Sequence, residues 1–88
     1  MHDNTTTRRL REEGLLPVVQ ACRLVPSERG ERRHVSRGTM LRWILTGKLG
    51  VRLEATRQGG DAWYTSQAAL DRFFDAIRER ELSRYNVW

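Results

Sequence analysis

The chain has 88 residues, a formal net charge of +5 and 39% hydrophobic residues, which suits one small folded domain. A domain of this size buries only ~60–65% of the surface of its unfolded chain, so its core is thin and leaves little room for an enclosed substrate pocket. The single cysteine, Cys22, excludes an intrachain disulfide and a zinc site built from several cysteines. No apolar run approaches the ~18 residues of a membrane span, and the N-terminus lacks the apolar centre of a signal peptide, so we expect a cytoplasmic protein.

The positive charge is concentrated in the middle of the sequence. Residues 1–20 carry three Arg and three acidic residues, residues 21–60 carry nine Lys or Arg and three acidic residues, and residues 61–88 carry four Arg and five acidic residues. Fifteen of the sixteen cations are Arg, whose planar guanidinium matches phosphate oxygens and guanine edges better than the Lys ammonium does. This placement favours a nucleic-acid-binding face, and a solvated Arg-rich surface is the alternative.

The first part of the chain divides into a polar stretch and a short helix. Residues 1–14 contain a run of Thr and mixed charges, which predicts a mobile arm ahead of a folded domain over 15–82 and a tail over 83–88. Pro17 suits the first turn of a helix over 17–25, because its missing N–H needs no partner there. One face of this helix carries the apolar positions Val18, Ala21, Cys22 and Val25.

A second, more basic helix follows a polar loop over 26–35. Ser36 is expected to cap a helix over 37–46 by accepting a hydrogen bond from a backbone N–H, and Gly47 to end it. The side of this helix that must dock to the core is formed by Met40, Trp43 and Ile44. We expect Trp43, the largest of these side chains, to pack against the last helix, in contact with Leu70, Phe73 or Phe74.

A β-hairpin and a third helix complete the chain. The stretch 51–56 alternates between apolar and polar residues, which is typical of a strand with one buried face. Gly59–Gly60 supplies the positive φ of a tight turn, so a hairpin is predicted over 51–65. Thr65 or Ser66 then caps a helix. Its apolar stripe is Leu70, Phe73, Phe74 and Ile77.

Together these elements predict a small α+β fold, a winged helix-turn-helix with helix, loop, helix, two-stranded hairpin wing and C-terminal helix. Three motifs carry a resemblance to a known family. The first is VVQACRLV, the second spans Ser36, Thr39, Met40, Arg42, Trp43, Ile44, Gly47, Lys48 and Leu49, and the third spans Gly59, Gly60, Trp63, Ala69, Leu70 and Phe73. On these residues the sequence resembles the excisionase/MerR-like winged helix-turn-helix superfamily, in a small uncharacterised bacterial branch. The resemblance covers about 16–77, with a longer loop at 26–35 than the family's usual turn.

The resemblance implies double-stranded DNA binding, with the helix over 37–46 in the major groove and the wing over 51–65 on the backbone. The implied biological roles are a small transcription regulator or an excisionase-type factor that sets the direction of recombination, or a DNA-binding subunit of phage DNA packaging. No cofactor or metal is implied. The implied DNA-binding residues are Arg33, His34, Arg37, Gly38, Thr39, Arg42, Arg52, Arg57 and Gln58.

Other classes of function have less support in the sequence. No spacing suggests a nucleophile and base pair, and no glycine-rich phosphate loop follows a strand, so we do not expect an enzyme. A protein–protein adaptor would use the winged-helix surface and the apolar C-terminal tail, which also suits self-association. RNA binding is disfavoured because the aromatic residues that would stack on bases, such as Trp43 and Phe73, are expected in the core.

Overall fold

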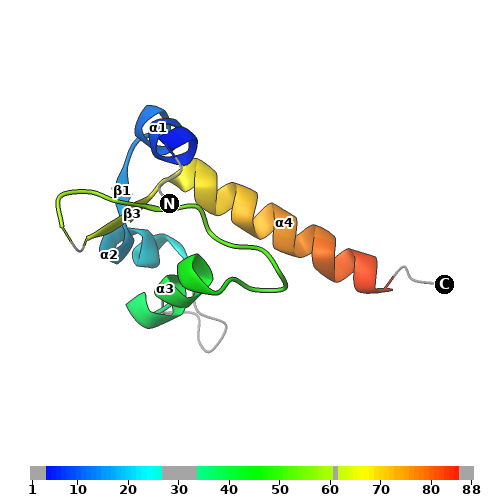
Figure 1. Cartoon of the computed structure of the whole chain (residues 1–88). Helices are drawn as coiled ribbons and strands as arrows, with labels where there is room; N and C mark the ends of the chain where they lie inside the picture. Colours follow the sequence, from blue (N-terminus) through cyan, green and yellow to red (C-terminus); the bar gives the residue numbers. More distant parts are fainter. Residues whose placement is uncertain (1–3, 27–33, 61, 86–88) are drawn as a thin grey trace.

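The computed structural model describes residues 4–26, 34–60 and 62–85. Within them the α+β fold class is confirmed, with helices packed around a small antiparallel sheet (Figure 1). The elements are α1 (Asn4–Glu13), β1 (Leu16–Pro17), α2 (Val18–Ala21), the 3₁₀ helix η1 (Cys22–Leu24), α3 (Arg37–Leu45), β2 (Thr56–Arg57), β3 (Trp63–Thr65) and α4 (Gln67–Tyr85). In the view of Figure 1, α1 lies above the sheet, α2 and α3 lie below it, and α4 extends away from it.

The three strands form one sheet in the order β1-β3-β2, with β3 in the centre. β2 and β3 pair through Thr56 with Tyr64 and Arg57 with Trp63, which confirms a hairpin closed by glycines with positive φ at Gly59 and Gly60. The hairpin is shorter than predicted, and the pairing of β1 with β3 was not foreseen.

Residues 51–55 are not a strand, because their backbone bonds to other partners. Lys48 and Val51 bond to each other across a two-residue turn at 2.8 and 2.9 Å, and the Leu53 N–H donates to the Trp43 carbonyl at 3.0 Å. The alternation of side chains survives in part, since Leu53 is buried and Arg52 exposed. The segment is therefore attached to α3 rather than paired in the sheet.

The N-terminal residues correct the prediction of a mobile arm. Residues 4–13 form α1, and Leu10 on this helix is 0% exposed in the core. Polar contacts hold the rest of the helix, including a hydrogen bond of 2.9 Å between the Thr7 and Thr56 hydroxyls. A single leucine in a polar stretch gives no helical periodicity, so the sequence pattern could not reveal this helix. The folded domain accordingly begins before residue 15.

The predicted helices over 17–25 and 37–46 are both present. The first is the short α2 continued by η1, with Val18, Ala21, Cys22 and Val25 buried as predicted. Ser36 caps α3 by accepting the Thr39 N–H at 3.1 Å. Gly47 ends α3 with φ +93°, and an ideal Cβ there would lie 2.6 Å from the Val51 carbonyl oxygen, so only glycine fits.

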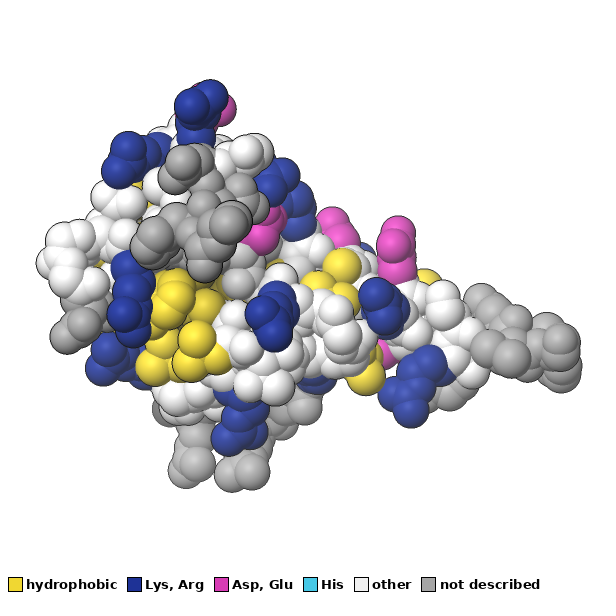
Figure 2. Space-filling view, viewed as in Figure 1, with side chains coloured by type: hydrophobic (Ala, Val, Ile, Leu, Met, Phe, Trp, Pro, Cys, Tyr) yellow, Lys and Arg dark blue, Asp and Glu magenta, His cyan; other side chains and the backbone are white. Residues whose placement is uncertain are grey.

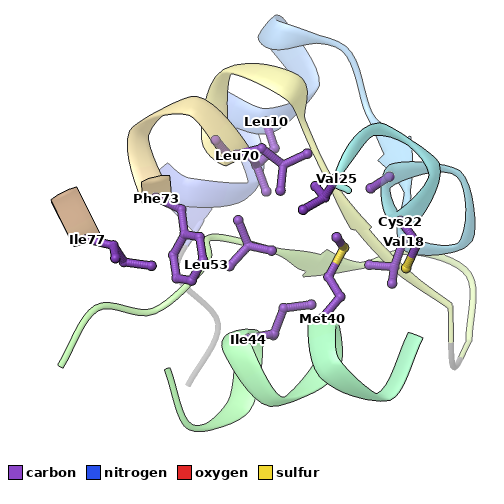
Figure 3. Close-up of a cluster of buried hydrophobic side chains, with 12 residues drawn as sticks. Leu10, Val18, Cys22, Val25, Met40, Ile44, Leu53, Leu70, Phe73 and Ile77 are labelled. Carbon is purple, nitrogen blue, oxygen red and sulfur yellow. The ribbon is translucent and has the colours of Figure 1, made fainter. Parts of the chain in front are cut away.

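The core lies between α3, α4 and the sheet, and Figure 3 shows Met40 and Ile44 pointing from α3 toward Leu53 and the other buried side chains. α4 contributes Leu70, Phe73 and Ile77, while Phe74 is half-buried, so most of the predicted stripe is confirmed. α4 runs to Tyr85, beyond the predicted domain end at 82.

The predicted contacts of Trp43 are confirmed. Its ring is half-buried, and its centroid lies 5.2 Å from that of Phe73 and 5.7 Å from that of Phe74. Such tilted and edge-on arrangements are the favoured geometries of aromatic pairs. Among the described residues, no helix is long and apolar enough to span a bilayer.

Candidate nucleic-acid interface

The side of α3 that faces away from the core is exposed and carries one cation. Met40 and Ile44 point inward, so at 100° per residue Gly38, Arg42 and Leu45 point outward. All three are exposed. Gly38 has no side chain to cover the first turn of the helix, and the space around it is open, since the one contact of an ideal Cβ there would be Ser36 Oγ at 3.8 Å. The helix backbone can thus approach a flat partner closely.

The predicted wing residues Arg52 and Arg57 line a groove beside this helix. The groove has a volume of about 510 Å³. Its walls are Thr6 and Thr7 of α1, Ile44 and Leu45 of α3, the segment from Arg52 to Arg57, and Trp63 of β3. Figure 2 shows hydrophobic side chains gathered between α1 and α3 with Lys and Arg side chains beside them. The groove joins the outward side of α3 to the hairpin.

The Arg57 guanidinium is held in a defined place on the hairpin. Its central carbon lies 4.9 Å from the ring centroid of Trp63, its partner across the strands. A guanidinium stacked on an indole loses fewer conformations on binding a phosphate than one that moves freely. The charge remains exposed, so it is available to a ligand.

Gln58, also predicted to contact DNA, has an intramolecular partner. Its side-chain oxygen accepts a hydrogen bond from the Arg11 guanidinium of α1 at 3.0 Å. Arg11 therefore lies at the hairpin, and Arg8 on the same helix is exposed. The sequence analysis placed both Arg residues in a mobile arm rather than on a docked helix.

Glu54, the only acidic residue between 34 and 60, is engaged in ion pairs. Its carboxylate accepts hydrogen bonds from Arg9 of α1 and from Arg72 Nε of α4, the latter at 2.9 Å. Arg72 also makes two hydrogen bonds to Glu13, at 2.5 and 3.1 Å. These contacts compensate the negative charge within the groove wall and join α1, the segment 52–55 and α4.

The network also fixes the charge states of its members. The Arg72 guanidinium and then the Ser66 hydroxyl, which donates to Glu13 at 2.7 Å, hold the pKa of the Glu13 carboxyl below its ordinary value of 4.5. The hydrogen bond to Glu13 raises the pKa of Arg72. Ser66 also caps α4 by accepting the Ala69 N–H at 2.9 Å, so the network begins at a helix terminus.

Three of the other predicted residues, His34, Arg37 and Thr39, lie at or just before the start of α3. Arg37 is exposed at the start of α3, near enough to Cys22 that its charge opposes the rise of the thiol pKa caused by burial. The Thr39 hydroxyl is 3.0 Å from that of the capping Ser36. His34 is exposed, and its backbone pairs with that of Pro26. Arg33 lies outside the described residues.

Leu45 and Trp63 also line the groove, and neither was among the predicted contacts. Leu45 is 59% exposed. An isolated apolar residue on a helix surface is common and signals nothing alone, so the sequence pattern does not single out Leu45. Trp63 was assigned only to a strand, and its contact with Arg57 depends on the register of the hairpin.

No group of three or more His, Cys, Asp and Glu side chains that could hold a metal ion occurs in the part of the chain that the structure describes. No family model matches the sequence, and no curated protein or solved structure matches it either.

Proposed function

We propose that this chain is a double-stranded DNA-binding protein that uses the winged helix-turn-helix mode. In this mode α3 enters the major groove, and Arg57 of the hairpin, together with Arg52 of the segment before it, contacts the neighbouring backbone. The observation that carries the proposal is the groove, which brings the outward side of α3 and the cationic hairpin to one side of the molecule. The resemblance to the excisionase/MerR-like superfamily supports the same mode.

The charge distribution favours duplex DNA as the ligand. Between 34 and 60 the sequence has five Lys or Arg and one acidic residue, and that acid, Glu54, is already paired with Arg9 and Arg72. Firm docking also fits base readout, since Met40 and Ile44 are buried and fix the orientation of α3. The proposed biological role is that of a small transcription regulator or an excisionase-type directionality factor. A DNA-binding subunit of phage packaging is a third candidate role of the same DNA-binding activity.

Duplex binding is tested by fluorescence anisotropy with a labelled random-sequence duplex at increasing salt. If about four to six phosphates are neutralised, the slope of log K against log salt should be roughly −4 to −5. Single-stranded RNA is the competitor, and it should displace the protein only weakly. Absence of binding at ~50 mM salt, or an affinity that does not change with salt concentration, would contradict the proposal.

A protein-binding role is the second candidate, and one hollow favours it. A cavity of about 350 Å³ between η1 and α4 is mostly apolar. It is lined by Leu24, Val25, Pro26, Gln67, Leu70, Asp71 and Phe74. It carries none of the predicted cations, so a partner there would be apolar rather than nucleic acid. An adaptor of this kind would bind random duplex DNA weakly in the same assay.

A further inference from the structure

Leu45 is an apolar side chain exposed within a cationic surface. It is 59% exposed, and it follows Arg42 by three residues on the same outward side of α3. Arg52 lies near the C-terminal end of α3, where its Cγ would be 3.1 Å from an ideal Cβ of Gly47. Leu45 and Arg52 line the same groove. Leu45 therefore stands between two cations and contributes little burial to the folded chain.

A surface that binds only phosphates gains nothing from an apolar side chain between its cations. The DNA major groove offers a suitable apolar partner, because thymine presents its C5 methyl group there beside the polar edges of the bases. We propose that Leu45 packs against a thymine methyl next to a guanine contacted by Arg42. The preferred DNA then contains a T·A pair adjacent to a G·C pair. This inference rests on the proposed function and specifies the ligand of the same site.

The geometry of α3 fits two neighbouring base pairs. Three residues advance an α-helix by about 4.5 Å, close to the ~3.4 Å between stacked base pairs. Leucine is shorter than arginine, so its contact requires the helix to lie deep in the groove. Gly38 allows that depth, since nothing but Ser36 Oγ lies within 4 Å of an ideal Cβ at this position. The bare turn and the exposed leucine thus support the same arrangement independently.

The test removes only the methyl group from the DNA. The probes are two duplexes of ~20 base pairs, about two helical turns, built from repeating TG/CA steps, one with thymine and one with uracil in its place. The repeat presents the pyrimidine on both sides of guanine, so either order of contacts is available. Affinities are measured by anisotropy at one low salt concentration for the native chain and for Leu45→Ala.

The native chain should bind the thymine duplex roughly fourfold more tightly than the uracil duplex, the effect of burying one methyl group. Leu45→Ala should bind the two duplexes equally, with an affinity close to that of the native chain for the uracil duplex. Leu24→Ala is the matched control, because Leu24 is 51% exposed, lies at η1 and does not line this groove. It should keep the preference for thymine.

Three outcomes would overturn the inference. Equal binding of both duplexes by the native chain would show that the methyl group is not contacted. A thymine preference that persists in Leu45→Ala would assign the contact to another residue. Either result leaves duplex binding itself intact, whereas failure of the native chain to bind either duplex overturns the proposed function and this inference with it. Far-UV circular dichroism of both variants confirms that they are folded.

Discussion

At the scale of single residues, Arg42 is the outward cation of α3 and the predicted contact with a guanine edge. Replacing Arg42 with alanine should weaken binding to a preferred site, selected from a random duplex pool, by ~1–3 kcal/mol. The loss on random DNA should be much smaller, because on most sequences Arg42 of the native chain contacts only a phosphate, and less binding energy is lost with it. Competition anisotropy with the two DNAs measures the difference.

Arg78 provides the matched control for Arg42. It lies on α4, where its side chain is 70% exposed and its nearest ionic partner is Asp75 at 3.4 Å. Arg78→Ala removes the same charge from the molecule without touching α3, so it should change both affinities equally and slightly. An equal loss on both DNAs for Arg42→Ala would make Arg42 a phosphate contact.

At the scale of elements, the sequence predicted the helices and the hairpin better than it predicted the contacts between them. Ser36, Gly47 and Ser66 have the expected capping roles because caps depend on local chemistry. The attachment of α1 depends on one buried leucine and on pairs such as Glu13 with Arg72, which are 59 residues apart in the chain. No local pattern encodes such a pair.

The candidate site was predictable to the same degree. Arg42 is exposed on α3, and Arg52 is exposed on the segment attached to α3 rather than in the predicted hairpin. The hydrogen bond of Gln58 to Arg11 was not predicted, because Arg11 belongs to the helix that the sequence did not reveal. The contact of Arg57 with Trp63 depends on a strand register that the two glycines alone do not determine.

The attachment of α1 makes stability depend on pH. The pKa of Glu13 is lowered in the folded state, so its contribution to stability is complete above the ordinary value of 4.5 and is lost as the pH falls through the folded value. Thermal melts of the native chain should therefore shift to lower temperature as the pH is lowered from about 5 toward 3. In Glu13→Gln this part of the shift should be absent.

Glu12→Gln is the control for this experiment, since Glu12 is the exposed neighbour on the same helix. It should keep the acid sensitivity of the native chain. Glu13 is partly exposed, with 18% of its side chain accessible, so solvent screening will keep the shift modest. Identical acid sensitivity in Glu13→Gln and the native chain would contradict a stabilising role for this ion pair.

At the scale of the whole molecule, charge is separated between two parts of the fold. α4, over 67–85, has four Arg and four acidic residues, whereas residues 34–60 have five cations and one acid. Because the charges of α4 cancel while residues 34–60 are net positive, the electrostatic potential is more positive on one side of the molecule. This difference orients the molecule toward a polyanion before contact. The salt dependence of duplex binding therefore reports on α3 and the hairpin rather than on the total charge.

Because the domain is small, its stability depends strongly on the packing of Trp43. Its ring contacts Phe73 and Phe74 and joins α3 to α4, and it is half-buried. Trp43→Ala should cost ~3 kcal/mol, the lower end of the range for truncating an aromatic side chain in a core. A domain this small has a stability of about 5 kcal/mol, so urea unfolding followed by circular dichroism should show a much lower midpoint. Leu45→Ala, two residues along the same helix, should leave the midpoint nearly unchanged because Leu45 is exposed. If Trp43→Ala instead kept its midpoint and lost only DNA affinity, Trp43 would act on the DNA and not in the core.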